Sequence, residues 1–355
     1  MTLTRRFVCT GLGGALLAPA AACGQAAPPA ETAAAPAPEQ VRDLDSAALT
    51  DAFTGAATLP QLRTMIVAQN GRVVREQVFR GPGLDTPVNI KSASKSIIAA
   101  LAGCALDRGV LKGLDQPIGP ILGARIPAAA DPRARLLTIE QLLSMAAGLE
   151  RTSGQNYGRW VSSRDWVAYA LSQPFVAEPG GRMLYSTGTS HIMSAVLTRA
   201  AGRSTLDLAR EWLGRPLGIT VPPWTRDPQG IYFGGNEMAL SPRALLRFGE
   251  MYRNGGLHGA TRVLSAAFVE DSWRSRGGRS PYTGYTYGLG WWLREAGPHR
   301  VNFAWGYGGQ MVFVIPSLAL SVVMTSDPTA RGGDGHVPAL HRLVDETIVA
   351  RTRSG

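Results

Sequence analysis

The chain has 355 residues, of which 45% are hydrophobic and 17% are charged. These proportions are those of a globular protein with a sizeable core and exclude a largely disordered chain. The formal net charge is +10, but the arginines are spread along the sequence, without zinc-finger spacing, an RNA-binding aromatic signature or a basic helix. We therefore expect no nucleic-acid partner.

Residues 1–23 predict an export signal. Arg5-Arg6 precede an apolar run from Phe7 to Leu17, and small residues follow. Both a twin-arginine route and a general secretory route fit this pattern. The apolar run is shorter than the roughly 18 residues that a membrane-spanning helix requires. We expect an exported, periplasmic protein.

Cys23 ends this segment after three alanines, where bacterial lipoproteins carry their acylated cysteine, although a leucine is usual at the position of Ala20. Residues 24–40 are rich in Ala and Pro and predict a linker. Two outcomes stay open, membrane attachment through a lipid on Cys23 and simple cleavage of the signal. Residues 41–355 contain no repeat and no second linker, so we expect one domain.

Strands are predicted near both ends of that domain. Residues 64–69 and 72–79 flank Asn70-Gly71, a strong hairpin signal. Three further strands are predicted at 300–305, 311–315 and 318–325. Strands, a helical insertion and strands again predict an α+β fold, in which a mixed antiparallel sheet of N- and C-terminal strands is flanked by helices and carries an inserted helical lobe.

Helix starts are clear in the middle of the chain. Thr138-Ile139-Glu140-Gln141 has the spacing of a capping box, and Ser241-Pro242 supplies an N-cap residue with a first-turn proline. Residues 96–106, which include Cys104, are apolar around most of the circumference, so this helix is expected to be buried. We interpret Cys104 as a small core residue rather than a nucleophile.

Ser92 and Lys95 stand immediately before that apolar stretch. Only three of the 36 basic residues are lysines, so a lysine beside a serine suggests a task that arginine cannot perform, namely losing a proton. Positions i and i+3 share one helix face, and burial at a helix start favours the neutral amine. A nucleophilic Ser92 activated by Lys95 is one interpretation. The other is a helix-capping Ser92 with Lys95 extending to solvent.

Two later segments are candidates for completing such a site. Tyr185 precedes a short loop that leads into the apolar helix 191–201, and it is either a proton carrier, if a lysine stabilises its phenolate, or a core aromatic. Residues 305–310 form a glycine-rich strand edge, either a ligand-approach site or a twisted hairpin. There is no intact Gly-x-Ser-x-Gly elbow and no metal-ligand pair of histidines, so we expect neither a metal nor a cofactor.

Ser92-Ala93-Ser94-Lys95, Tyr185-Ser186-Thr187 and Tyr307-Gly308-Gly309, in this order, resemble the three active-site elements of the serine β-lactamase and penicillin-binding protein superfamily. The chain is most similar to the class C-like branch, which includes esterases, D-amino acid peptidases and 6-aminohexanoate-dimer hydrolases. Segments 137–145, 235–242 and 287–292 resemble the same branch, so the resemblance runs from about residue 64 to residue 327.

This resemblance implies a β-lactamase/DD-peptidase-like fold and a serine hydrolase. Ser92 would be acylated, Lys95 and Tyr185 would share the proton transfers, and the backbone N–H groups of Ser92 and Gln310 would form the oxyanion hole. The substrate contacts it implies are Asn236, Trp305, Tyr307, Gly308 and Gly309.

Two positions depart from the class C pattern. Thr187 stands where those β-lactamases have an asparagine, and Tyr307 stands where they have a lysine that helps to hold the substrate carboxylate. The departures favour hydrolysis of a small-molecule ester or amide with a less acidic substrate. Two alternatives remain, a β-lactamase or D,D-peptidase and a non-catalytic cell-wall-binding domain on the same fold.

Overall fold

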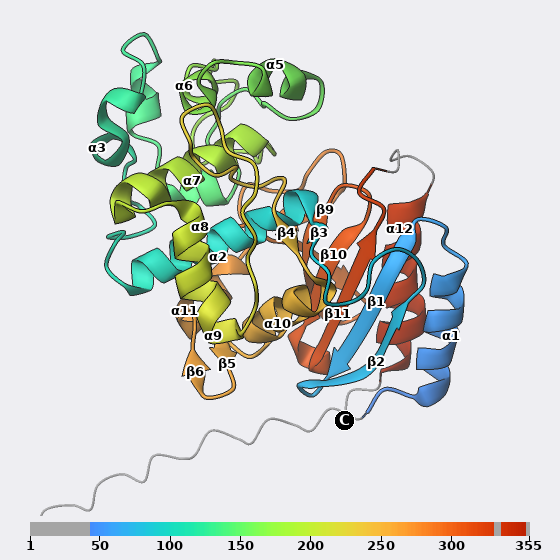
Figure 1. The fold of residues 1–355 in the computed structure, drawn as a ribbon. Helices are drawn as coiled ribbons and strands as arrows, with labels where there is room; N and C mark the ends of the chain where they lie inside the picture. Colours follow the sequence, from blue (N-terminus) through green and yellow to red (C-terminus); the bar gives the residue numbers. More distant parts are fainter. Residues whose placement is uncertain (1–42, 330–334, 353–355) are drawn as a thin grey trace, which may run out of the picture. The chain divides into compact units, whose positions relative to one another are not determined.

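The computed structural model describes residues 43–329 and 335–352, which belong to one compact unit, and its main layer is a seven-stranded sheet (Figure 1). The strand order is β2-β1-β11-β10-β9-β8-β7, and every neighbouring pair is antiparallel. The strands of this sheet are β1 Leu62–Gln69, β2 Arg72–Val78, β7 Thr286–Tyr287, β8 Trp292–Ala296, β9 His299–Gly306, β10 Gln310–Ile315 and β11 Leu320–Ser326. The predicted export signal at 1–23 and linker at 24–40 lie outside the described residues.

The sheet joins the two ends of the domain, as predicted. β1 pairs directly with β11 and forms a hairpin with β2, whose turn residues Asn70 and Gly71 have φ values of 53° and 77°. The strand predicted from Leu318 begins at Leu320, because Pro316–Leu318 form a 3-10 helix. β7 and β8 were not predicted as strands. These two strands complete the sheet at the end opposite β2.

Twelve α-helices occur in the described part of the chain. They are α1 Ser46–Ala57, α2 Ser94–Asp107, α3 Gly119–Leu122, α4 Ile139–Leu143, α5 Tyr157–Val161, α6 Trp166–Leu171, α7 Thr187–Ala201, α8 Thr205–Leu208, α9 Arg215–Leu217, α10 Pro242–Arg253, α11 Ala266–Ser272 and α12 His336–Arg342. Short two-stranded ladders join β3 Val88–Asn89 to β4 Ala239–Leu240 and β5 Leu257–His258 to β6 Thr261–Arg262.

Helices cover both faces of the sheet. α1 and α12 lie on one face, where Phe53 and Leu340 join a buried apolar cluster with Phe313 of β10 (Figure 1). α2, α7 and α10 belong to the helical lobe on the other face, and their buried side chains form a second, larger cluster with sheet residues such as Val312 and Val323. The start of α2 lies where this lobe meets the sheet (Figure 1).

The predicted helix starts are confirmed. Thr138 accepts from the Gln141 N–H, and the Gln141 side chain accepts from the Thr138 N–H, which completes the capping box of α4. Ser241 accepts from the Ala244 N–H and caps α10. These caps satisfy backbone donors that a helix start leaves without partners.

Cys104 is buried in α2, as predicted. Its thiol donates to the Val263 carbonyl at 3.5 Å, and burial raises the thiol pKa to about 12. Because only a thiolate is an effective nucleophile, Cys104 is an inert core residue at neutral pH.

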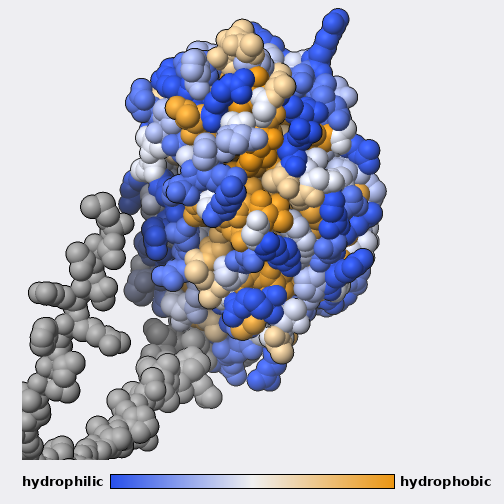
Figure 2. Space-filling model, turned by 90° about the vertical axis from the view of Figure 1, so that its left-hand side faces the viewer, coloured by the Kyte–Doolittle hydropathy of each residue, from blue (hydrophilic) through white to orange (hydrophobic). Residues whose placement is uncertain are grey.

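One face of the domain carries an apolar band. Figure 2 shows this face, with hydrophobic side chains forming a continuous strip and hydrophilic side chains covering the surface around it. No helix within residues 43–329 or 335–352 has the length and apolar character needed to cross a membrane.

Candidate active site

Ser92 lies in a 3-10 helix, Lys91–Ala93, that runs directly into α2. The start of α2 has no side-chain cap, so the Ser92 hydroxyl is not used for capping. Lys95 is 2% exposed and does not extend to solvent. The helix-cap interpretation is therefore wrong, and the serine and the lysine share the first turn of a buried helix.

The Lys95 amine is held by three oxygen atoms. Nζ lies 3.2 Å from Ser92 Oγ, 3.2 Å from Thr187 Oγ1 and 2.8 Å from the Gly235 carbonyl oxygen. Burial lowers the pKa of this amine to about 7, because a low-dielectric interior penalises the charged form. A neutral amine has two N–H groups for Gly235 and Thr187, which leaves its lone pair for the Ser92 hydroxyl. The geometry thus suits a proton acceptor beside a serine.

The oxygen atoms around the lysine are themselves held in place. Thr187, the first residue of α7, contacts Ser153 Oγ through its hydroxyl at 3.0 Å and through its N–H at 2.8 Å. Gly235 has a φ of +95°, and a Cβ atom there would lie 2.5 Å from Ser190 Oγ and 2.7 Å from Lys95 Cγ. Only glycine fits such a contact without displacement. Sequence reasoning missed Ser153 and the Gly235 carbonyl, although the Gly234-Gly235 pair signals close backbone approach.

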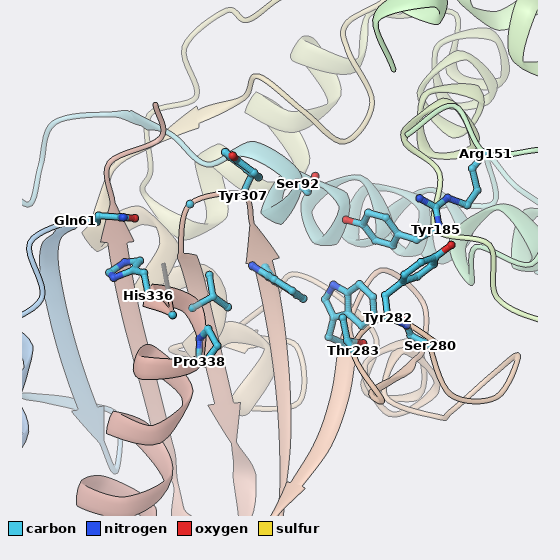
Figure 3. Close-up of a pocket in the computed structure, with 15 residues that line it drawn as sticks. Gln61, Ser92, Arg151, Tyr185, Ser280, Tyr282, Thr283, Tyr307, His336 and Pro338 are labelled. Carbon is cyan, nitrogen blue, oxygen red and sulfur yellow. The ribbon is translucent and has the colours of Figure 1, made fainter. Parts of the chain in front are cut away.

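Tyr185 lies beside both predicted partners. Its phenol points toward Ser92 (Figure 3), and Lys95 Nζ lies 4.9 Å from the centroid of its ring. Burial raises the pKa of the phenol above its ordinary value, and this effect outweighs the opposite effect of the nearby Ser92 hydroxyl. The sequence interpretation of Tyr185 as a proton carrier required a lysine that stabilises its phenolate. In the structure Lys95 faces the ring instead. Tyr185 therefore keeps its proton at neutral pH.

The turn between β9 and β10 packs against the segment that precedes Ser92. A Cβ atom at Gly306 would collide with the Ile90 carbonyl oxygen, so the two backbones touch. Gln310 begins β10, and its buried side chain is fixed by two hydrogen bonds to the Ser326 backbone. The structure therefore brings the Ser92 and Gln310 segments to the same end of the sheet.

The structure brings only some of the predicted substrate contacts into the pocket beside Ser92. Trp305, Tyr307 and Gly308 line it, whereas Gly309 and Asn236 do not. A Cβ atom at Gly309 would point toward Leu340 and Ser326. The Asn236 side-chain amide donates to the Tyr157 hydroxyl at 2.8 Å. Asn236 instead follows Gly235, whose carbonyl binds the lysine.

The pocket beside Ser92 has a volume of about 580 Å³ and mostly apolar walls (Figure 3). Its aromatic side chains come from separate parts of the chain. The lining residues are Gln61, Ser92, Arg151, Tyr185, Ser280, Tyr282, Thr283, Trp292, Trp305, Tyr307, Gly308, Gly335, His336, Val337 and Pro338. Such a pocket suits a small organic molecule with a largely apolar body.

Among residues 43–329 and 335–352, no group of three or more His, Cys, Asp or Glu side chains is placed to hold a metal ion. The candidate site is built from a serine, an amine, a phenol and backbone groups.

The fold and the Ser-x-x-Lys geometry are those of a serine hydrolase related to the β-lactamases and penicillin-binding proteins. The Beta-lactamase family model matches residues 50–344, most of the chain. The chain belongs to this family and, with it, to the serine β-lactamase and penicillin-binding protein superfamily.

This chain is similar to a curated relative in sequence and to solved structures in fold. The D-alanyl-D-alanine-carboxypeptidase/endopeptidase AmpH of Escherichia coli K12 is 25% identical over 177 residues, which span 46% of this chain and 45% of AmpH, less than half of the curated relative. A Bacillus anthracis protein described as a 6-aminohexanoate-dimer hydrolase matches with a TM-score of 0.67 and 17% identity, over 84% of this chain and 80% of that one. EstCE1, described as a hydrolase with promiscuous acyltransferase activity, matches with a TM-score of 0.68 and 20% identity, over 85% and 96% of the two chains. At these identities the structural matches establish the shared α+β fold.

Proposed function

We propose that this protein hydrolyses an ester or amide bond through an acyl-enzyme on Ser92. The observation that carries the proposal is the buried Lys95 amine, with its pKa lowered to about 7, at 3.2 Å from Ser92 Oγ. As Oγ attacks the carbonyl carbon, the neutral amine accepts the hydroxyl proton. Lys95 is thus the general base of the first step.

Tyr185 is the proposed second proton carrier. Because burial raises the pKa of its phenol, the group is protonated and can supply a proton to the departing oxygen or nitrogen as the bond to carbon breaks. The proton taken up by Lys95 then restores the phenol. In the second half of the cycle, water attacks the acyl carbon, Ser92 Oγ regains a proton, and the carboxylic acid leaves.

The proposed oxyanion hole uses the backbone N–H groups of Ser92 and Gln310. The close packing of Gly306 on Ile90 supports this assignment, because it holds the start of β10 near the start of α2. Two N–H donors directed at one carbonyl oxygen would stabilise the negative charge that develops in the transition state.

The test is hydrolysis of a p-nitrophenyl ester by Ser92→Ala. We expect kcat/KM to fall at least about 1,000-fold, since removal of a nucleophile abolishes the acyl-enzyme path. The matched control is Ser94→Ala, which removes a neighbouring buried hydroxyl that donates to the Lys91 carbonyl. Mass spectrometry should find the acyl group on the peptide that contains Ser92. Equal rates for Ser92→Ala and the parent would refute the proposal.

A D,D-peptidase is the second candidate, favoured by the match to AmpH. Release of D-alanine from a peptide ending in D-Ala-D-Ala, faster than hydrolysis of simple esters, would promote it. Thr187 and Tyr307, which replace the residues of the class C pattern, support the ester or amide proposal instead.

A further inference from the structure

Arg151 is the only permanently charged side chain among the described residues that line the pocket. No aspartate or glutamate lies in this lining, and burial lowers the pKa of His336, so that imidazole is neutral at pH 7. An apolar pocket with a single fixed cation attracts a ligand with an anionic group.

The Arg151 guanidinium has no acidic partner among the residues that the structure describes. The guanidinium packs against the ring of Tyr282, whose centroid lies 4.8 Å from Cζ. Two other partly buried arginines are ion-paired, since Arg276 contacts Glu140 and Asp271, and Arg294 contacts Asp345. Arg151 differs from these two arginines, and its guanidinium lies in the active-site pocket.

The backbone of Arg151 is fixed next to the proposed catalytic residues. Thr152, the next residue, contacts the Ser186 hydroxyl through its N–H at 3.2 Å and through its own hydroxyl at 3.1 Å. Ser186 directly follows Tyr185. Figure 3 shows Tyr185 between Ser92 and Arg151, with Tyr282 beside the guanidinium. The cation is therefore held at the Tyr185 end of the pocket.

We propose that Arg151 binds a carboxylate of the substrate, and that this hydrolase acts on an ester or amide carrying a carboxylate at the end of an apolar segment. The proposal rests on the proposed function of Ser92. The guanidinium can donate two parallel hydrogen bonds to a carboxylate, while Trp292 and Trp305 line the space for the apolar segment. The sequence favours a less acidic substrate, because Tyr307 stands where class C β-lactamases have a lysine that helps to hold the substrate carboxylate. In the structure Arg151 supplies a cation at another position of the pocket.

Two matched pairs of esters test this proposal and show which side of the scissile bond bears the carboxylate. The acyl pair is 4-nitrophenyl hydrogen glutarate and 4-nitrophenyl methyl glutarate. The leaving-group pair is 4-carboxyphenyl acetate and 4-(methoxycarbonyl)phenyl acetate. Within each pair the carboxylate is replaced by its neutral methyl ester. We expect the parent protein to prefer the acid in one pair by at least about 10-fold in kcat/KM, as a charge-assisted hydrogen bond would give.

Arg151→Gln should remove this preference. We expect kcat/KM for the preferred acid to fall about 10- to 100-fold and that for its methyl ester to stay within about 3-fold. Arg151→Lys should lie between the two, because it keeps the charge but loses the paired donors. The control is Arg182→Gln, which changes the net charge equally at an exposed arginine outside the pocket and should leave the preference unchanged.

The outcomes separate this proposal from that for Ser92. Preference for neither acid, or an equal effect of Arg151→Gln on acid and methyl ester, would overturn the carboxylate site while leaving the hydrolase intact. Failure of the parent to hydrolyse any of the esters would count against the Ser92 proposal. In that case calorimetry with the glutaric acid monoanilide and Ser92→Ala protein decides the role of Arg151 without turnover. Binding that Arg151→Gln weakens at least 10-fold supports the site, and equal binding overturns it.

Discussion

The floor and the rim of the pocket are built in different ways. At the floor, the Lys95 amine contacts three oxygen atoms, and Thr187 is held in turn by Ser153. At the rim, Tyr282 is 78% exposed and Tyr307 is 55% exposed. The floor is a buried polar network in which each group has a defined partner, whereas the rim consists of large side chains that face solvent.

This difference indicates that the floor and the rim have separate roles, in chemistry and in substrate preference. Buried polar groups without partners are costly, so a satisfied network fixes the amine in one position and keeps its pKa low. Exposed aromatic side chains contribute little to folding and are available for a ligand. Changes at the floor should therefore reduce the rate of chemistry for all substrates, and changes at the rim should alter which substrate is preferred.

The largest effect is expected from Lys95→Arg. Arginine stays charged and cannot accept the Ser92 proton, so kcat/KM should fall about 1,000-fold or more. In the parent protein the pKa of Lys95 is lowered to about 7. The amine is protonated and inactive below this pH and neutral above it, so kcat/KM should rise with pH through about 7 and then level.

The control for this substitution is Lys112→Arg at an exposed lysine, which should preserve both rate and pH profile. A Lys95→Arg variant within 10-fold of the parent would exclude Lys95 as the base. A rate that does not change between about pH 5 and pH 9 would lead to the same conclusion.

Gly235→Ala should have the next largest effect. The new methyl group would meet Ser190 Oγ and Lys95 Cγ, and it would also require a φ of +95°. We expect about 100-fold lower kcat/KM and a loss of unfolding free energy greater than the roughly 1–3 kcal/mol that positive φ alone costs. Enzyme kinetics and thermal unfolding measure these two effects separately.

Gly230→Ala is the matched control, because Gly230 has a φ of +84° and open space around it. It should lose stability through backbone strain but keep its activity. If both alanine variants lose activity equally, the close contact between Gly235 and Lys95 is not the cause of the activity loss in Gly235→Ala.

Local sequence pattern predicted one part of the floor and missed another. Ser92 and Lys95 are three residues apart on one helix turn, so residue type and spacing were enough to bring them together. The Gly235 carbonyl is 140 residues from Lys95 and reaches it only through tertiary packing. Asn236 was predicted to contact substrate because its neighbours resemble the family, but its amide is bound by Tyr157.

The sheet shows the same limit. β1, β10 and β11 are buried along nearly their whole length and have apolar sequences, so they were predicted. β8 includes the charged pair Arg294-Glu295, which interrupts the apolar pattern, and it is a strand because of its pairing with β9. Arg151 lies in a loop, where no periodic pattern distinguishes a pocket cation from a surface one.

A smaller effect at the floor is expected from His191. Its Nδ1 accepts from the Gly234 N–H at 3.2 Å, so its Nε2–H donates to the Asp227 carboxylate at 3.0 Å, and both side chains are fully buried. Because Gly234 precedes the carbonyl that binds Lys95, we expect His191 to position that carbonyl. His191→Asn keeps an acceptor near Gly234, whereas His191→Gln keeps a donor near Asp227.

We expect His191→Gln to lower kcat about 10-fold with little change in KM, and His191→Asn to lower it less. The ordering tests the link to Lys95, since both variants lose one hydrogen bond and should be destabilised to a similar degree. Equal kcat values, or a greater loss in His191→Asn, would show that the pair supports only the fold.

The smallest effect is expected at the rim, from Tyr282→Ser. Because the side chain is 78% exposed, its removal should change the unfolding free energy by less than about 0.5 kcal/mol. Hydrolysis of a neutral ester should stay within about 3-fold of the parent rate, since Tyr282 contacts Arg151 rather than Ser92 or Lys95.

Trp292→Ala is the contrasting variant. Trp292 lines the same pocket but is only 6% exposed, and its ring stacks on that of Tyr185 with the two centroids 5.2 Å apart. Its loss should cost about 3–5 kcal/mol. A Tyr282→Ser variant that unfolds as readily as Trp292→Ala would mean that the rim is part of the core, and the division between floor and rim would no longer hold.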